Sequence, residues 1–190
     1  MTVNAILEAT AHILTAEGYE AANTNRIAEL AGVSIGSLYQ YFPNKEALIT
    51  SLATSHAHEM LEMVESKLKD LSDAPIADVL SALVKACIEA HAKNPKLHKI
   101  LNEQISHLGL IHQVENVERE IAGLLRSYLE KWRSHIKIRD LDLTVFILGH
   151  TVESLTHAVV IEHPELLSRK QFEQEITHLL LSYLGLTEQN

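Results

Sequence analysis

The sequence predicts an all-α protein of about nine helices, and three observations lead to this fold class. Proline (4 residues) and glycine (7 residues) are scarce in a chain of 190 residues, so few turns interrupt it. No segment alternates polar and apolar residues for long enough to indicate a β-strand. Apolar residues instead recur with helical spacing, most clearly over 115–135.

Three helices are expected at the N-terminus, and turn residues mark their ends. Gly18 and Gly32 suit the left-handed conformation that ends a helix. Thr24 and Ser34 suit the N-cap positions of the second and third helices, because their hydroxyl groups can accept the first free N–H groups. The expected ranges are 3–17, 25–31 and 35–42.

A long helix follows over 45–71, where Pro43 ends the third helix and Asn44 can cap the next one. At 1.5 Å per residue it spans roughly 40 Å, which is long enough to couple the N-terminal helices mechanically to the rest of the chain. The remaining helices are expected over 76–92, 96–106, 115–135, 141–162 and 169–185.

The helix over 141–162 is apolar on nearly every side, so it is expected to be buried on two faces. Its own core would cover one face, and a partner subunit would cover the other. Gly149 would permit a second helix to approach closely. The competing interpretation is a central helix that is fully buried inside a monomer.

Composition and charge narrow the class of protein. The chain has 46% hydrophobic and 22% charged residues, as globular proteins do, and its net charge of −9 argues against coating nucleic acid by charge alone. The single cysteine, Cys87, excludes an internal disulfide and fits a cytoplasmic protein. The N-terminus does not have the pattern of a signal peptide, and the apolar segment 143–161 contains His150, Glu153 and His157, too polar for a membrane span.

Residues 24–45 carry the strongest functional pattern. Two short helices joined by a turn at Gly32 are typical of DNA readers, because the second helix can lie in the major groove. Leu38 and Phe42 give that second helix one apolar side, which leaves the opposite side free to face outward. Spacing alone also fits a helical hairpin that serves only for packing.

Two residues in this segment are costly for helix stability. Gly36 costs roughly 1 kcal/mol relative to alanine, and close approach to a DNA strand would explain it. Lys45 opposes the dipole at the start of its helix by roughly 0.3–1 kcal/mol, but there it would attract a phosphate. Ser37 and Tyr39 can donate hydrogen bonds to phosphates, and Gln40 can reach a base edge.

Residues 5–52 closely resemble the N-terminal domain of TetR/AcrR-family transcriptional regulators. The matching pattern reads Ile6-Leu7-x-Ala9, Gly18-Tyr19, Thr24-x-x-Ile27-Ala28, Ala31-Gly32-Val33-Ser34-x-Gly36-x-Leu38-Tyr39-x-Tyr41-Phe42 and Lys45-x-x-Leu48. The remainder of the chain matches only in the number, length and order of its helices. The resemblance implies a homodimer with a helix-turn-helix DNA-binding domain over 1–46 and an effector-binding and dimerisation domain over 47–190.

The resemblance also implies individual roles. Phosphate contacts are implied for Thr24, Ser37, Tyr39 and Lys45, and base contacts for Asn25, Ile35, Gly36 and Gln40. The implied function is a ligand-responsive regulator, most often a repressor, that a small-molecule effector releases from a near-palindromic double-stranded DNA operator. The long helix would act as the lever. The alternative is a partner-binding helical module that keeps the motif but no longer reads DNA.

One departure from the family pattern concerns charge. Family members usually begin with a basic arm, whereas residues 1–50 hold two basic residues against five acidic ones. Either the natural start lies upstream, or DNA binding relies on few phosphate contacts. For the chain as given, we expect operator affinity to depend only weakly on salt.

In such a family the helices 141–162 and 169–185 would form the dimer, and the effector would bind among 76–92, 96–106, 115–135 and 141–162. About a third of the candidate lining residues are expected to touch a ligand. The candidates are Leu83, Cys87, His91, Leu108, Ile111, Leu125, Tyr128, Trp132, Phe146, His150 and Glu153. The side chains of His150, Glu153 and His157 share one helix face and could satisfy each other at a dimer seam, contact a ligand or bind a metal.

No enzymatic activity, cofactor or metal site is expected. A di-metal carboxylate bundle needs two Glu-x-x-His pairs, and only Glu175-x-x-His178 has that spacing. Cys87 has no catalytic signature around it. His56 and His58 are expected to face solvent on the long helix.

Overall fold

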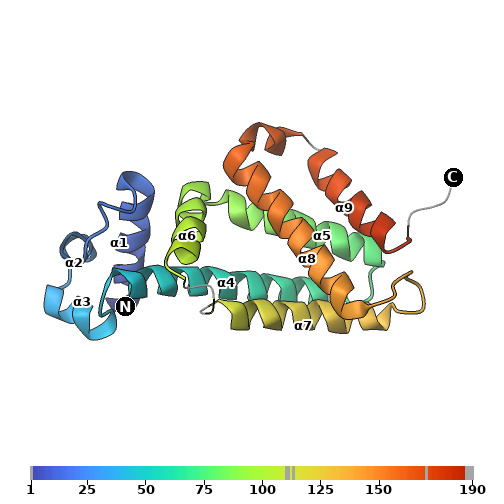
Figure 1. Cartoon of the computed structure of the whole chain (residues 1–190), viewed down its shortest axis with the longest axis horizontal. Helices are drawn as coiled ribbons and strands as arrows, with labels where there is room; N and C mark the ends of the chain where they lie inside the picture. The colour runs from blue at the N-terminus through green and yellow to red at the C-terminus, as the bar shows by residue number, and fades with distance from the viewer. Residues whose placement is uncertain (1, 110–111, 113, 170, 187–190) are drawn as a thin grey trace. The chain divides into compact units, whose positions relative to one another are not determined.

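The computed structural model describes residues 2–109, 112, 114–169 and 171–186, and every regular element within these ranges is helical (Figure 1). This confirms the expected all-α class. Nine α-helices, a π-helical turn (η2) and a 3₁₀ helix (η3) are present in the described residues. Their bounds are α1 Thr2–Glu17, α2 Thr24–Ala31, α3 Ile35–Tyr41, α4 Lys45–Asp70, α5 Ile76–Ala92, α6 Pro95–His107, α7 Glu115–Lys131, α8 Leu141–His157, η2 Ala158–Glu162, η3 Pro164–Ser168 and α9 Gln171–Tyr183.

Contacts divide the chain into two compact units. Unit 1 contains the residues up to His58 together with Asn94–Asn116, and unit 2 contains Glu59–Lys93 and the residues from Val117 onward. The helix α4 belongs to both units, because the division falls within it. The segment that holds α6 therefore groups with the N-terminal helices, whereas the sequence placed the domain boundary between residues 46 and 47.

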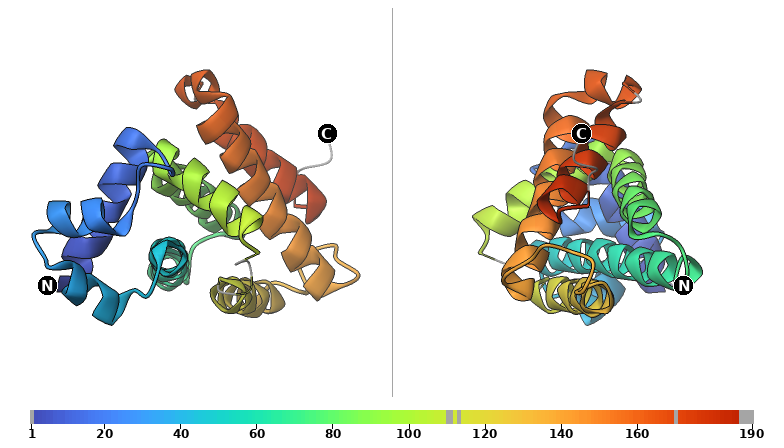
Figure 2. Two further views of the ribbon diagram at one scale, coloured as in Figure 1. Left: turned by 60° about the vertical axis from the view of Figure 1, so that its left-hand side comes forward. Right: turned by 90° about the vertical axis from the view of Figure 1, so that its right-hand side faces the viewer.

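The core of unit 1 is shared by α1, α2, α3, α6 and the first half of α4. The helix α1 packs against α2 and α6, and α2 packs against α3 (Figures 1 and 2). Leu101 and Ile105 bring α6 into this core. The side chains buried most completely are Ile6, Ile13, Leu14, Ile27, Leu38, Leu48 and Ile49. Because one hydrocarbon core holds all of these helices, α6 is part of the body that positions α3.

The core of unit 2 is organised around α5, which packs against α8 and α9 (Figures 1 and 2). Val79 and Val84 of α5 and Leu184, just after α9, are almost completely buried. At the exposed edge, Arg126 of α7 pairs with Asp142 of α8 at 2.7 Å. Exposed ion pairs of this kind contribute about 1 kcal/mol or less, so the apolar core holds the unit together.

Several helix ends differ from those that the sequence predicted. The helix α7 ends at Lys131 instead of 135, and the last helix begins at Gln171 instead of 169, after η3. The regular part of α8 ends at His157, and its expected continuation to 162 is a π-helical turn. The wider turn accompanies burial of both Val159 and Val160, a change of phase that sequence periodicity does not reveal.

The segment Leu141–Glu162 has the length and apolar character of a membrane-spanning helix, with a mean hydropathy of 1.4. Its inner side, which includes Leu141, Val145 and Leu148, is part of the core of unit 2. Its outer side carries polar residues as well as apolar ones. Packing in a protein core therefore accounts for part of its apolar character.

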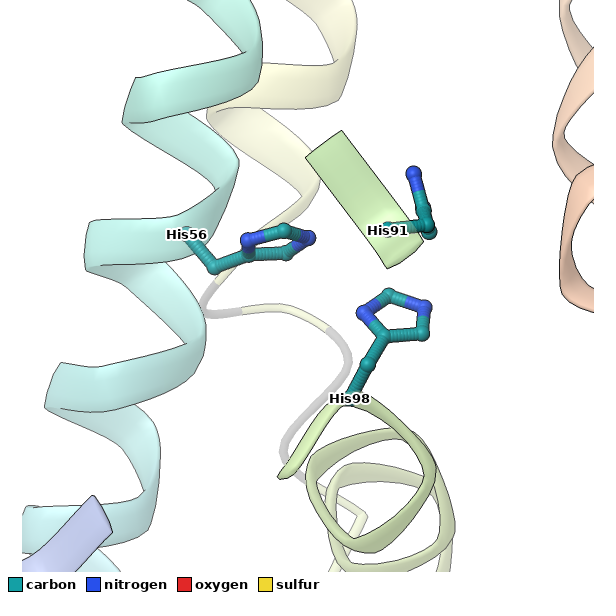
Figure 3. A group of neighbouring side chains, drawn as sticks. All are labelled: His56, His91 and His98. Carbon is teal, nitrogen blue, oxygen red and sulfur yellow. The ribbon is translucent and has the colours of Figure 1, made fainter. Parts of the chain in front are cut away.

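Both histidines of α4 were expected to face solvent, and the structure confirms this for His58 but not for His56. His58 is exposed, and its ring nitrogen Nδ1 donates a hydrogen bond to the carbonyl of Thr54 at 2.8 Å. His56 is half-buried, and its ring centre lies 5.0 Å from that of His98 on α6 (Figure 3). The expectation for His56 is wrong because α6 packs within unit 1, a long-range contact that helix periodicity cannot predict.

Candidate functional site

Capping residues build the turn between α2 and α3. Asn23 is the N-cap of α2, because its side-chain oxygen accepts a hydrogen bond from a first-turn backbone N–H at 3.0 Å. The expectation that Thr24 caps this helix is wrong by one residue, since Thr24 already lies within α2. Gly32 ends α2 with a φ of +67°. Ser34 caps α3 in the same manner as Asn23 caps α2, also at 3.0 Å.

The helix α3 presents one side to the core and the other to solvent. Leu38 is fully buried, whereas Tyr39 is 50% exposed. The hydroxyl of Tyr39 lies 3.0 Å from the hydroxyl of Thr24, which joins the middle of α3 to the start of α2. The candidate contact residues that are exposed here are Asn25, Ile35, Gly36, Tyr39 and Gln40. We call these five residues, with Thr24, the recognition face.

Packing within the protein does not explain why residue 36 is a glycine. A Cβ atom built on Gly36 would meet only Ser34 Oγ, at 3.8 Å, which is an ordinary van der Waals contact. Its φ angle lies outside the left-handed region that favours glycine. The protein's own packing therefore permits alanine at this position. Ser37, beside it, is half-buried, and its hydroxyl lies 2.8 Å from that of Ser34.

The side chain of Lys45 is directed toward the loop that follows α1. Its Nζ donates a hydrogen bond to the backbone carbonyl of Tyr19 and lies 3.4 Å from the centre of the Tyr19 ring. Partial burial lowers the pKa of Lys45, and the nearby Glu20 and Glu46 oppose that shift. In this arrangement Lys45 holds the start of α4 against the loop. A phosphate contact from Lys45 would require its side chain to swing outward.

Arg26 is engaged in an ion pair on the surface of unit 1. Its Nη2 lies 2.7 Å from Glu17 Oε1, and this bond lowers the pKa of the Glu17 carboxyl group. Arg26 and Lys45 are the basic residues of the first 50 positions. Both already have partners within unit 1, so few cations here are available to phosphates.

Sequence patterns gave no role to two further exposed side chains of this region, Leu30 and Tyr41, each 51% exposed. Tyr41 ends α3, one residue beyond Gln40, and its phenol could donate a hydrogen bond to a phosphate. An aromatic residue at an exposed helix end was the available signal for Tyr41. Leu30 offered none, because single exposed leucines are common in proteins.

The candidate effector residues lie in different parts of the fold. Leu83, Cys87 and His91 on α5, Leu125 and Tyr128 on α7, and Trp132 just after α7 lie in unit 2. Leu108 follows α6 in unit 1, and Phe146, His150 and Glu153 lie on the exposed side of α8. Ile111 lies outside the described residues.

A group of polar side chains lies within unit 2 between α5 and α8. The sulfur of Cys87 lies 3.8 Å from both His91 Nδ1 and Thr156 Oγ1. Burial raises the pKa of the Cys87 thiol to about 11, so at neutral pH this thiol is uncharged and a poor nucleophile. Burial also lowers the pKa of His157, whose ring centre is 5.1 Å from that of His91. The group therefore suits hydrogen bonding better than nucleophilic catalysis by Cys87.

Tyr128 adds a buried polar atom on α7. Its side chain is 7% exposed, and its hydroxyl has no hydrogen-bond partner among the described residues. Burial raises the pKa of Tyr128, and the nearby side chain of Trp132 offsets part of that rise. The side chain of Trp132 does not, however, reach the geometry of a hydrogen bond to the Tyr128 hydroxyl. Leaving a buried hydroxyl unpaired costs about 1–3 kcal/mol. A polar group of a ligand would remove that cost.

Large exposed hydrophobic side chains of unit 2 gather at its C-terminal helices. Those described as exposed are Leu143 and Phe146 on α8, Leu167 on η3, and Leu179 and Tyr183 on α9. The ring of His150 stacks on Phe146 with centres 4.1 Å apart. A Cβ atom at Gly149 would meet nothing within 4 Å. The outer sides of α8 and α9 thus carry large apolar side chains among polar ones, and no described part of the chain covers those apolar side chains.

Two models of known protein families match the chain. The model of "Bacterial regulatory proteins, tetR family" matches residues 6–52, which include the recognition face. The model of "Tetracyclin repressor-like, C-terminal domain" matches residues 75–184. Together they cover more than half of the sequence, with a separate model for each end of the chain.

Individual relatives agree with the family models. The uncharacterized HTH-type transcriptional regulator YhgD of Bacillus subtilis is 27% identical over 165 residues, 85% of each chain. The HTH-type transcriptional repressor KstR of Mycolicibacterium smegmatis is 48% identical over 46 residues, which are 24% of this chain and 22% of that protein. The transcriptional regulator FadR of Bacillus subtilis, solved in complex with stearoyl-CoA, has the same fold with a TM-score of 0.71 and 20% identity over 95% of this chain and 98% of its own.

Proposed function

The chain belongs to the TetR family of bacterial regulatory proteins, and we propose that it acts as a homodimeric repressor that a small-molecule effector releases from a near-palindromic DNA operator. The recognition face carries this proposal. It combines an exposed short helix, a hydrogen bond that orients it on α2, and a glycine that the protein's own packing does not require. No enzymatic step is part of the proposal, and the cytoplasm, where bacterial DNA lies, is the expected compartment.

The recognition face supports a division of roles. Gln40 and Asn25 are exposed amides that can pair with base edges, and Ile35 can contact a thymine methyl group. Thr24 and Tyr39 place hydroxyl groups at the start of α2 and on α3, where they can donate to phosphates. The hydroxyl of Ser37 is paired with that of Ser34 in the same way that Thr24 is paired with Tyr39, whereas Lys45 can join them only after releasing the carbonyl of Tyr19.

Dimerisation through α8 and α9 is supported by the exposed hydrophobic side chains of unit 2. All of those described belong to α8, η3 or α9, and α7 contributes none among its described residues. Burying them against a second copy would remove apolar surface from water at about 25 cal/mol per Å². A two-fold dimer presents two recognition faces, which fits a pseudo-palindromic operator with half-sites about 34 Å apart.

We propose that the effector binds in unit 2, near Tyr128 and near the polar side chains of Cys87, His91 and Thr156. Tyr128 lies in the apolar core of unit 2, and Cys87, His91 and Thr156 are buried hydrogen-bonding side chains, which suits a ligand with an apolar body and a polar group. Release of DNA requires that the effector bind one conformation better than the other. The helix α4 belongs to both units, so a shift along it can alter the separation of the two recognition faces.

Operator binding is the direct test of this function. Selection from random DNA duplexes should recover a near-palindromic site, and a gel shift should show binding by the wild-type chain. Tyr39→Ala should weaken that binding at least about tenfold, which corresponds to 1.4 kcal/mol. Failure to select any sequence would favour a helical module that binds a protein partner instead.

Salt dependence gives a second check. Since Arg26 and Lys45 are engaged within unit 1, we expect a shallow slope of log affinity against log salt concentration. Each neutralised phosphate contributes about −0.9 to that slope, and we expect a magnitude below about 5 for the dimer. Fluorescence anisotropy between low and physiological salt measures it. A slope near −10, typical of strongly basic readers, would show that cations outside this face dominate binding.

Tyr128 gives a prediction that needs no knowledge of the effector. Tyr128→Phe removes the unpaired hydroxyl. The free energy of unfolding should rise by roughly 1 kcal/mol, because no buried hydroxyl is then left without a hydrogen-bond partner. Urea denaturation followed by circular dichroism measures this change. A loss of stability of similar size would mean that the hydroxyl is bonded in solution. Tyr41→Phe, at an exposed tyrosine of α3 outside the proposed dimer surface, is the matched control and should change little in the absence of DNA.

A further inference from the structure

Two histidines meet inside unit 1, away from the recognition face. His56 lies in the part of α4 that belongs to unit 1, and His98 lies in the first turn of α6. Both side chains are half-buried, and their ring centres are 5.0 Å apart with the planes at 64° (Figure 3). One ring nitrogen of each lies within 4.8 Å of the other. The pair has no part in the DNA-binding or dimer proposals.

We propose that His56 and His98 bind a divalent transition-metal ion of the zinc or nickel type that bridges α4 and α6. Imidazole nitrogen is a preferred ligand of these ions, with metal–nitrogen distances of about 2.0–2.1 Å. Two nitrogens on one tetrahedral ion are therefore roughly 3.4 Å apart. The two ring nitrogens, which lie within 4.8 Å of each other, would have to approach to that separation by rotation of the side chains. Water or further side chains complete the coordination.

The surroundings favour a defined site over chance contact. His56 and His98 come from two helices whose backbones are already fixed by a shared core, which includes Ile49, Leu101 and Ile105. The entropy cost of bringing the two ligands together has thus been met by folding. An ordinary edge-to-face pair of aromatic rings is the alternative explanation of the same geometry.

Bridging would have a mechanical consequence. The helix α6 packs on α1, which packs on α2, and α4 begins at Lys45, shortly after the end of α3. An ion between α4 and α6 would tie these elements together and stabilise unit 1. Metal binding is a property of the folded chain alone, so it stands apart from the proposed DNA-binding function.

The test uses untagged full-length protein that has been treated with a chelator and then titrated with Zn²⁺ in a calorimeter. The wild-type chain should bind one ion with a dissociation constant in the micromolar range or tighter, and Zn²⁺ should raise its melting temperature. His56→Gln and His98→Gln keep polar side chains of similar size, and each should weaken that binding at least about tenfold.

The chain has 12 histidines, so matched controls are needed. His58→Gln on α4 and His107→Gln on α6 remove exposed histidines from the same two helices and should bind as the wild type does. Circular dichroism of each variant establishes that it is folded. Equal binding by His56→Gln, His98→Gln and wild type would overturn the site, as would equal losses in the controls or no binding by the wild type.

Discussion

Gly36→Ala should separate stability from DNA binding, weakening operator affinity at least about tenfold while leaving the fold intact or more stable. The added methyl group would meet only Ser34 Oγ, at 3.8 Å, so the chain can accept it. Alanine gains up to about 1 kcal/mol in helix propensity, which would raise the melting temperature by roughly 2–4 °C. On DNA, the same methyl group would occupy the space between the recognition face and the groove.

The matched control is Gly123→Ala. Gly123 lies in α7 and is exposed, and a Cβ atom there would meet nothing within 4 Å. This variant should gain similar helix stability without any change in operator affinity. Anisotropy on the selected operator and thermal unfolding of both variants provide the comparison. Wild-type DNA affinity in Gly36→Ala would remove the reason for proposing that DNA approaches α3 at this residue.

Phe146→Glu should convert the dimer into monomers at micromolar concentration. Phe146 is 57% exposed in the single chain, so the substitution does not disturb the core of unit 2. In a dimer, the carboxylate would be buried in apolar surroundings without a partner, which is strongly unfavourable. Operator affinity should then fall by a factor of about 100 or more, because the two recognition faces no longer bind as one particle.

Sedimentation equilibrium measures the mass of the particle, and Ser127→Glu is the matched control. Ser127 is exposed on α7, where no large hydrophobic side chain is exposed among the described residues. This variant should remain dimeric. Should Phe146→Glu also remain dimeric, the second copy must attach elsewhere than at the outer side of α8. A wild-type chain that sediments as a 21.2 kDa species, the mass of one chain, would contradict the proposed dimer.

Local patterns predicted most of the helices and the surface of α3. Helix periodicity and capping residues depend on neighbours within a few positions, so they can be read along the chain. The same patterns failed by one residue at the start of α2, where Asn23 and Thr24 are both good capping residues. Which of the two residues caps the helix depends on the backbone conformation that the preceding loop allows at each position.

Lys45 illustrates a second kind of limit. Its position in the first turn of α4 indicated a phosphate contact, but its side chain bonds the carbonyl of Tyr19, 26 residues earlier. A flexible side chain takes the partner that the tertiary structure brings near, and spacing within one helix does not show that partner. The same limit explains why His56 was expected to face solvent and instead lies against His98.

The sequence by itself determined the helical class, the turn between α2 and α3 and the side of α3 that faces outward. These features follow from hydrophobic periodicity and from the conformational preferences of glycine and capping residues, which act over a few positions. Only the tertiary structure decided that α6 shares the core of α1, that Lys45 and Arg26 are engaged within unit 1, and that α8 and α9 carry uncovered apolar surface. Those outcomes depend on packing between segments far apart in the chain, where many arrangements satisfy the same local pattern.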